Sequence, residues 1–395
     1  MQEYNKDNFL TNWILNDKYF DMLSLLGSLS GLFSDNTIPY LNYRITENIF
    51  CKYYMAENDA RDCTSYDARL TNLGIGIKTF ILKNDYSTEK VAEFNKLRPQ
   101  LLAFKGKDLA RKLGEFRNKR IEFANELYKI ESAQYHIIGR KEGLLRIFNV
   151  PYDKINIDNI HINKDSEASI IFNDEVNEYS FNKSKSVLLQ KFRLSTLYKD
   201  VPVKILENPL ELLEQFFNQI KGSTKRVALD KGKDYVILPL YSLRTHTVAE
   251  HSGLNQWNAN GRLRHEDELY IPVPAFIHQQ YPNFFPSRDE SFELLLPDGK
   301  KLSAKMCQEG SKGLMSNPNK ELGHWLLRDI LHKPPRTLVT IQDLYEFGFD
   351  SICVQKMNYL NECGQCVYKI YFTQNMESYD TFSSESNNDT IPKSV

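Results

Sequence analysis

Apolar side chains recur with helical spacing in several stretches of the N-terminal half of the chain. The spacing predicts helices over residues 8–33, 40–55, 105–130 and 209–220. Residues 87–99 are a further candidate, because Ser87 is a good N-cap and Pro99 disfavours continuation of a helix.

Between these stretches, apolar and polar residues alternate as they do in β-strands. The alternation predicts strands over residues 63–67, 74–82, 134–138, 144–150, 169–173 and 178–182. Residues 1–225 are therefore predicted to form one domain, a mixed sheet flanked by helices.

Residues 233–375 are predicted to form a second, β-rich domain. Its first strand is expected at Tyr235–Leu240 and its last at Val367–Thr373. Lys221–Arg226, which is polar and basic, is the candidate linker, and the tail over 376–395, rich in Ser, Asn and Asp, is expected to be disordered. The predicted fold class is thus α/β followed by a β domain.

Composition narrows the class of protein without identifying it. The 395 residues are 26% charged and 41% hydrophobic, as in ordinary globular proteins. No apolar run is long enough to span a membrane, so a soluble, cytoplasmic protein is expected. A net charge of −1 does not exclude a DNA-binding protein, because basic side chains can gather in patches.

Two polar loops carry the candidate DNA-binding residues. They span residues 252–264 and 307–319, and they are rich in amide and basic side chains with few carboxylates. Such side chains pair with base edges in the major groove, although an ordinary surface loop is the alternative. The candidates are Asn255, Gln256, Asn258, Asn260, Arg262 and Arg264 in the first loop and Lys312, Ser316, Asn317 and Asn319 in the second.

Segments around these loops resemble a known family. Residues 266–274, 284–286, 296–299, 304–308 and 315–319 are similar to the C-terminal half of NgoFVII-type restriction endonucleases. That half is a β pseudobarrel of the plant B-three type, in which two arms grip the major groove. The resemblance implies sequence-specific recognition of double-stranded DNA by arms at residues 244–264 and 308–319.

The N-terminal half looks like a PD-(D/E)XK nuclease. Asp67 precedes Lys78 by eleven residues, and Lys78 lies in a predicted strand. In that superfamily a carboxylate and a lysine on neighbouring strands meet at the scissile phosphate, with Mg²⁺ bound by carboxylates. This chain has Gly76 where the superfamily has an acidic residue, so the second carboxylate must come from elsewhere.

Two glutamates are candidates for that second carboxylate. Glu47 lies on the predicted helix before the strand and Glu93 on the predicted helix after it. Glu47 is favoured, which gives Asp67 and Glu47 as metal ligands and Asp67, Lys78, Glu47 and Glu93 as catalytic candidates. The alternatives are a chance Asp–Lys spacing and two solvated glutamates.

Other chemistries lack their motifs. None of the eight histidines has a lysine two positions later, as a phospholipase-D-like nuclease requires. No Gly-Lys-Ser/Thr follows Gly74-Ile75-Gly76, so no nucleotide cofactor is expected.

The sequence therefore predicts a type II restriction endonuclease that depends on Mg²⁺ and does not associate with a membrane. Cleavage of two strands by one site per chain implies a homodimer. A modification-dependent endonuclease that reads a methylated base is one alternative. A non-catalytic, sequence-specific DNA-binding regulator is the other.

Overall fold

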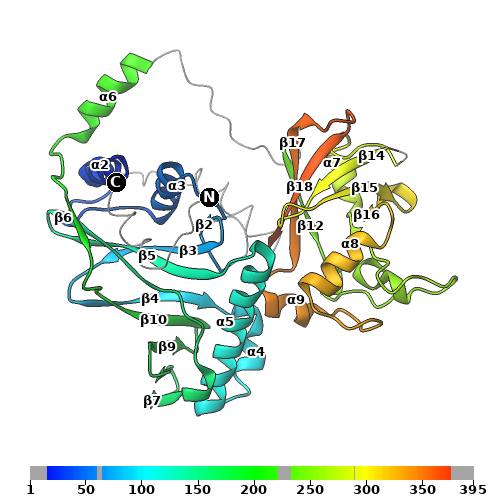
Figure 1. The fold of residues 1–395 in the computed structure, drawn as a ribbon, viewed down its shortest axis with the longest axis horizontal. Helices are drawn as coiled ribbons and strands as arrows, with labels where there is room; N and C mark the ends of the chain where they lie inside the picture. Colours follow the sequence, from blue (N-terminus) through cyan, green and yellow to red (C-terminus); the bar gives the residue numbers. More distant parts are fainter. Residues whose placement is uncertain (1–15, 60–64, 221–232, 289, 375–395) are drawn as a thin grey trace, which may run out of the picture. The chain divides into compact units, whose positions relative to one another are not determined.

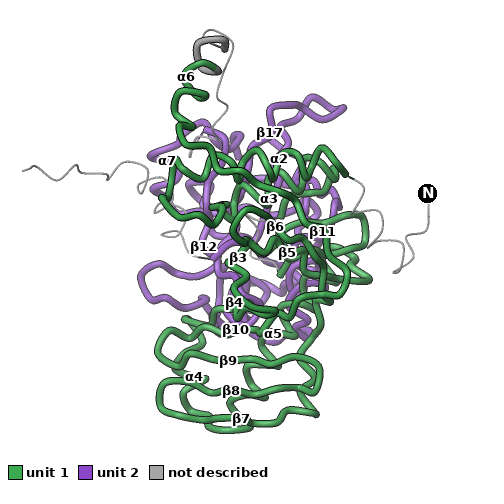
Figure 2. Tube along the Cα trace, turned by 90° about the vertical axis from the view of Figure 1, so that its left-hand side faces the viewer, with its two compact units in different colours: residues 1–226 green, residues 227–395 purple. Residues whose placement is uncertain are grey.

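The chain folds into two compact units, residues 1–226 and residues 227–395 (Figure 2). The computed structural model describes residues 16–59, 65–220, 233–288 and 290–374. The predicted linker and tail lie outside the described residues, as do the first two residues of the strand predicted at 63–67; residues 65–67 are described but do not form a strand, and β2 begins at Ala68. No described helix is long and apolar enough to cross a membrane.

Unit 1 contains a six-stranded mixed sheet. Its order is β1-β2-β3-β5-β6-β11, and β3 and β5 run parallel while the other neighbours are antiparallel. The strands are β1 (Glu57–Asn58), β2 (Ala68–Leu70), β3 (Leu73–Ile81), β5 (Ser132–Lys141), β6 (Leu144–Pro151) and β11 (Lys199–Pro202). The strands predicted at 74–82, 134–138 and 144–150 are confirmed as β3, β5 and β6.

Helices α2 (Asp17–Ser28) and α3 (Tyr43–Tyr54) cover one face of this sheet (Figure 1). Their apolar sides, with Tyr19 and Phe50, pack in one buried cluster with Ile75 and Ile77 of β3. Each helix has an asparagine N-cap. The side chain of Asn16 accepts a backbone N–H of the first turn of α2, and that of Asn42 accepts one of α3.

A second, antiparallel sheet lies against the opposite face, in the order β4-β10-β9-β8-β7 (Figures 1 and 2). Phe192 of this sheet joins the two layers, since its ring contacts Phe80 and Tyr135 of the first sheet. The strands are β4 (Tyr86–Glu93), β7 (His161–Asp165), β8 (Ser169–Asn173), β9 (Glu178–Asn182) and β10 (Val187–Arg193). The predictions at 169–173 and 178–182 are confirmed.

The helix predicted over 87–99 is wrong. Residues 86–93 form strand β4, which pairs along its length with β10. Its side chains alternate between exposed and half-buried, and Ser87 is a strand residue rather than an N-cap. A short 3-10 turn η2 (Asn95–Leu97) and helix α4 (Arg98–Leu101) follow the strand.

The other helices of unit 1 agree with the sequence pattern. Helix α5 (Gly106–Tyr128) confirms the helix predicted at 105–130 and packs beside the second sheet (Figure 1). Helix α6 (Pro209–Ile220) confirms the prediction at 209–220. Short 3-10 turns η1 (Leu29–Leu32) and η3 (Ile157–Asn159) complete the described elements of this unit.

Unit 2 is built on a seven-stranded sheet in the order β12-β17-β18-β14-β15-β16-β13. The end strands β12 and β13 are not hydrogen-bonded to each other, so the sheet is not a closed barrel. The strands are β12 (Tyr235–Pro239), β13 (Ile271–Pro272), β14 (Ser291–Leu295), β15 (Lys301–Cys307), β16 (Gly313–Ser316), β17 (Ser351–Leu360) and β18 (Cys366–Thr373). The first and last strands lie where the sequence predicted them.

Short helices complete unit 2 (Figure 1). They are η4 (Gly253–Asn258), α7 (Ala275–Gln280), η5 (Glu309–Ser311), α8 (Glu321–His324), the π-helix η6 (Trp325–Ile330) and α9 (Ile341–Phe347). Trp325 is buried and stacks on Phe372 of β18 at 5.6 Å between ring centroids, which anchors η6 to the sheet.

Candidate active site and nucleic-acid interface

The short hairpin of β2 and β3 brings Asp67 next to Lys78. Ala68 pairs with Ile75, so Asp67 runs alongside β3. Its Oδ2 accepts the backbone N–H of Ile77 at 2.7 Å, and Lys78 is the next residue of the strand. An eleven-residue separation in sequence thus becomes adjacency in the fold.

Helix α3 adds Glu47 to this pair. Glu47 is 5% exposed, and its pKa is raised to about 7, first by burial and then by the charge of Asp67. The charges of Arg44 and Lys78 act in the opposite direction and lower the pKa of Glu47. Glu47, Asp67 and Lys78, together with Arg44, therefore form one electrostatic group, which we call the carboxylate cluster.

The two carboxylates of the cluster are a candidate cation site. Burial also raises the pKa of Asp67, while Lys78, the N–H of Ile77 and Arg44 lower it. Two crowded carboxylates favour a divalent cation, and Mg²⁺ commonly takes one or two carboxylates with water and phosphate oxygens. The described residues hold no group of three or more His, Cys, Asp or Glu that could bind a metal, so Glu47 and Asp67 are a two-carboxylate set.

Glu93 does not join this cluster. It lies on β4 in the second sheet, where its carboxylate contacts Lys90 at 3.1 Å and also Asn95. The prediction of Glu93 as a helical residue is wrong, because residues 86–93 form strand β4 and pair with β10.

Close packing around position 76 accounts for the glycine found there in place of an acidic residue. A Cβ at this position would lie 2.8 Å from the ring of Tyr135 and 2.9 Å from that of Tyr152. These two rings stack at 4.1 Å between centroids and fill the space beside β3. An aspartate or glutamate at position 76 therefore requires these tyrosines to move.

Sequence reasoning missed Arg44 and Asp59. Arg44 Nη1 lies 3.1 Å from Glu47 Oε2, a contact that the spacing of three residues on a helix indicates. Asp59 is buried and pairs with Arg69, and its backbone N–H donates to the carbonyl of Asp67 at 3.1 Å. No signal in the sequence pointed to Asp59.

In unit 2 the two predicted loops border one hollow of about 520 Å³, which we call the loop hollow. Polar and basic side chains dominate its lining, and none of the described lining residues is aromatic. The lining residues are Gln256, Arg262, Arg264, Glu268, Lys305, Gln308, Met315, Ser316, Asn317, Pro318 and Asn319.

Glu268 organises the arginines of the first loop. It is 3% exposed and pairs with Arg262, while Arg264 Nε lies 3.6 Å from the same carboxylate oxygen. Arg264 also donates to three loop carbonyls, the shortest bond being 2.6 Å to Ala259. Arg262 keeps an exposed side chain, whereas Arg264 is largely buried and shapes the loop.

Three side chains that were predicted to contact bases instead form hydrogen bonds within the protein. Asn255 is fully buried, donates to the carbonyls of Ala249 and Val339 and accepts the N–H of Val339. Ser316 is also fully buried and accepts the N–H of Leu322 at 2.9 Å. Asn258 donates to the carbonyl of Glu250 at 3.0 Å. These groups hold the loops in shape.

The remaining candidates differ in position. Gln256, Asn317 and Asn319 line the loop hollow, and Asn317 is exposed. Asn260 and Lys312 are exposed but lie outside its lining. Sequence reasoning passed over Lys305 and Glu268, although both flank the predicted loops.

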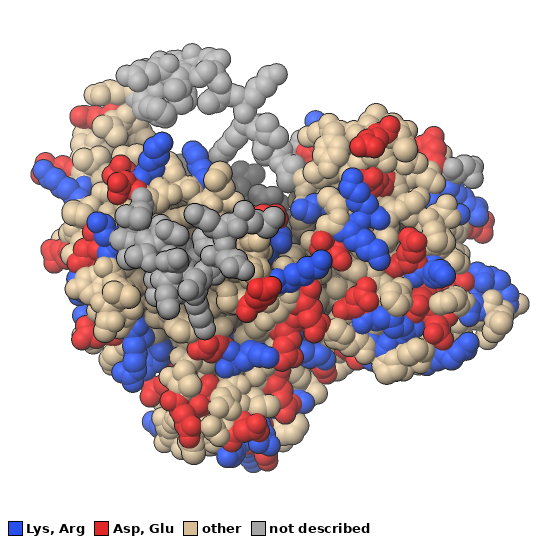
Figure 3. Space-filling model, in the orientation of Figure 1, with Lys and Arg blue, Asp and Glu red and all other residues tan. Residues whose placement is uncertain are grey.

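Charge is not concentrated on the face drawn in Figure 3, where basic and acidic side chains are interspersed over both units. The total of 50 Lys and Arg against 51 Asp and Glu agrees with this distribution.

Residues 233–358 match the NgoFVII C-terminal B3-like DNA-binding domain. The matched segment contains both loops and every residue that lines the loop hollow. No curated protein matches the chain. Unit 2 therefore carries a B3-like DNA-binding domain related to that of restriction enzymes.

Proposed function

We propose that the protein is a type II restriction endonuclease that hydrolyses both strands of DNA at a specific sequence with Mg²⁺. The observation that carries the proposal is the convergence of Glu47, Asp67 and Lys78 in a chain whose other unit is a B3-like DNA-binding domain.

Each residue of the carboxylate cluster has a separate role in the proposed reaction. Glu47 and Asp67 would hold the cation, and the N–H of Ile77 fixes the orientation of the Asp67 carboxylate. When bound, the ion supplies polarisation of the scissile phosphate and of the attacking water. Lys78 orients that water and balances the charge that develops on the phosphate.

The side chains that line the loop hollow recognise the DNA sequence. Arg262, Gln308 and Asn317 offer guanidinium and amide groups that suit guanine and adenine edges. The lining lacks an aromatic side chain for a methyl group, which favours unmodified DNA over a methylated base. Two chains, one for each strand, make the active form a homodimer.

A digest of unmethylated plasmid DNA by the purified full chain tests the proposal. Discrete bands that require Mg²⁺ and disappear in chelator are expected. Bands on methylated DNA alone would favour the modification-dependent enzyme. A gel shift without cleavage on either DNA would leave a DNA-binding regulator and refute the catalytic role of unit 1.

A further inference from the structure

Arg262 combines an exposed side chain with a fixed position. Its side chain is 57% exposed and lines the loop hollow. Among the described residues its guanidinium makes two hydrogen bonds, from Nη2 to the carboxylate of Glu268 and from Nη1 to the carbonyl of Leu263 at 3.2 Å. A guanidinium has five N–H donors, so two are used and three are left for a ligand.

The carboxylate that holds Arg262 is itself closed to a ligand. Glu268 is buried, and on its other side Arg264 Nε lies 3.6 Å from the same oxygen. Arg264 Nη1 bonds to three carbonyls of the first loop, so its guanidinium supports the loop backbone. Glu268 therefore connects an arginine that supports the loop to one that faces the hollow.

The backbone that carries Glu268 is fixed by α8 and η6. The carboxylate of Asp267 accepts from Arg328 Nε at 2.8 Å, and its Oδ2 lies 3.3 Å from His324 Nδ1. A Cβ at Gly323 would lie 1.7 Å from the carbonyl oxygen of Asp267, so α8 packs directly on this backbone. Because α8 follows the second loop in the chain, the position of Glu268 is defined relative to both loops.

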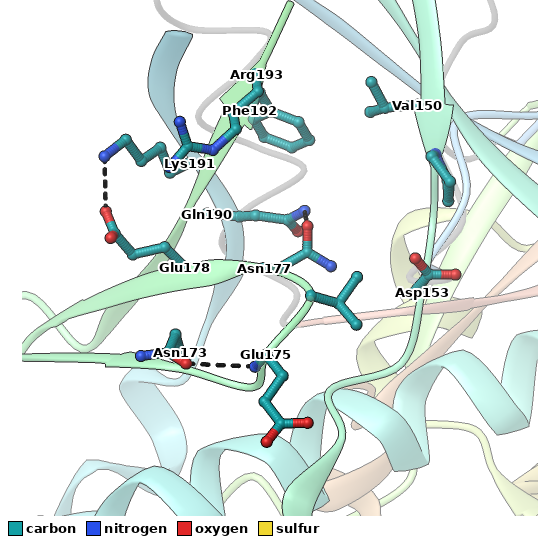
Figure 4. A pocket seen from close by; sticks show the side chains of 12 residues that line it. Val150, Asp153, Asn173, Glu175, Asn177, Glu178, Gln190, Lys191, Phe192 and Arg193 are labelled. Atoms are coloured by element: carbon teal, nitrogen blue, oxygen red, sulfur yellow. Dashed lines mark hydrogen bonds and ion pairs between the residues drawn. The ribbon is translucent and has the colours of Figure 1, made fainter. Parts of the chain in front are cut away.

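A cavity of about 420 Å³ in unit 1 lacks this arrangement (Figure 4). Arg193 lines it and is exposed, and no carboxylate of the described residues forms an ion pair with its guanidinium. Lys191, in the same lining, contacts Glu178 at 3.0 Å, but the side chain of that glutamate is 36% exposed. A buried carboxylate behind an exposed guanidinium distinguishes the loop hollow from this cavity.

A guanidinium held in this way suits guanine. The major-groove edge of guanine presents two acceptors, O6 and N7, which two N–H groups of one arginine can bond together. Adenine presents one acceptor and one donor there, so an arginine gains less from it. Holding the side chain in place before DNA binds also reduces the conformational entropy that is lost on binding.

We propose that Glu268 is a positioning residue that holds Arg262 against a guanine of the recognition sequence. Arg262 makes the base contact, and Glu268 acts through it without touching DNA. The inference rests on the proposed recognition of DNA by unit 2, and it is independent of cleavage by unit 1.

Selection from random DNA duplexes by the full chain, in chelator, tests this inference. Wild type should select a sequence with a guanine at a fixed position, and Arg262→Ala should lose the preference at that position alone. Glu268→Gln should weaken the same preference by about fivefold, because a neutral amide holds the guanidinium less firmly than a carboxylate. Glu290→Gln, an exposed change in unit 2 outside the hollow lining, is the matched control and should select the wild-type sequence.

A duplex with 7-deazaguanine at the selected position lacks the N7 acceptor. Wild type should bind this duplex about tenfold less tightly than the natural one, whereas Arg262→Ala should bind the two equally. On a scrambled duplex, Glu268→Gln should bind at least as tightly as wild type, because the substitution removes a negative charge. A variant that had only lost its fold would bind both specific and scrambled DNA less tightly.

Three outcomes would overturn the inference. Tighter specific binding by Glu268→Gln would show that the ion pair withholds Arg262 from DNA. A guanine preference that survives Arg262→Ala, or one that is unchanged in Glu268→Gln, would refute the contact or the positioning role while leaving sequence recognition intact. A wild-type selection without any preferred base would refute sequence recognition by unit 2 as well.

Discussion

The carboxylate cluster of unit 1 and the loop hollow of unit 2 are assembled in opposite ways. Glu47 and Asp67 are twenty residues apart in sequence, yet a hairpin and a covering helix bring them into one electrostatic group. The hollow draws on two compact loops whose candidates are neighbours in sequence, and several of these form hydrogen bonds to backbone groups elsewhere in the protein. Proximity in sequence is therefore a poor guide to which polar side chains face a ligand.

The two sites also differ in electrostatic balance. In the carboxylate cluster, burial raises the pKa of both acids, and the charge of Asp67 raises the pKa of Glu47 further. In the hollow, the buried carboxylate of Glu268 is matched by Arg262 and Arg264. The first site therefore keeps two crowded carboxylates, whereas the carboxylate of the second site is paired with arginines.

The largest expected effect separates cleavage from binding. Asp67→Asn and Lys78→Ala should each lower the rate of DNA cleavage by about a thousandfold, because the first weakens the proposed cation site and the second removes the positive charge beside the reacting phosphate. DNA affinity, measured by gel shift, should stay unchanged since unit 2 is intact. Glu93→Gln is the matched control and should cleave normally. Cleavage by Asp67→Asn at the normal rate would place the active site elsewhere.

The next effect concerns the folding of unit 2. Asn255→Ala removes three buried hydrogen bonds and leaves two carbonyls and one N–H without partners. It should lower the free energy of unfolding in urea by about 3 kcal/mol. Asn260→Ala, an exposed change in the same loop, should stay within about 0.5 kcal/mol of wild type. Equal stability of the two variants would contradict a structural role for Asn255.

The sequence predicted part of the carboxylate cluster correctly. The rest depends on tertiary contacts, which the sequence pattern does not reveal. Alternation located β3, so Lys78 was correctly placed on a strand, and the short hairpin made its approach to Asp67 foreseeable. The same reasoning failed at Glu93, because Ser87 and Pro99 suggested a helix while pairing with β10 imposed a strand. Local signals cannot report a partner strand about one hundred residues away.

The polar loops show a second limit of the sequence. Counting amides and guanidiniums correctly identified where the hollow lies. It could not separate Asn317, which is exposed in the hollow, from Asn255, which is buried by contacts with residues near Val339. That distinction depends on backbone atoms far away in the chain, which residue type does not specify.

A smaller effect tests the crowding of the carboxylate cluster. The folded pKa of Glu47, about 7, lies above its ordinary value of 4.5, so the folded state binds more protons between these values. Wild-type stability should therefore fall as pH rises from about 4.5 to 7. Glu47→Gln carries no such charge and should be more stable than wild type by about 2 kcal/mol at pH 8, but similar at pH 4.

Thermal denaturation with chelator measures this difference. Addition of Mg²⁺ should raise the melting temperature of wild type more than that of Glu47→Gln, because a bound cation stabilises the folded state. A stability difference that is the same at pH 4 and pH 8 would show that the pKa of Glu47 is not raised in the folded protein.

The smallest effect separates base reading from phosphate contact within unit 2. Asn317 lines the loop hollow, so Asn317→Ala should weaken binding to the specific site by about 1 kcal/mol and leave non-specific binding unchanged. Lys312 is exposed outside the hollow, so Lys312→Ala should weaken both kinds of binding and reduce the salt dependence by about one ion. Titrations on specific and scrambled duplexes at several salt concentrations resolve the two patterns. If both variants lose affinity equally on both duplexes, the hollow contacts the DNA backbone, and base reading must lie with other residues of the loops.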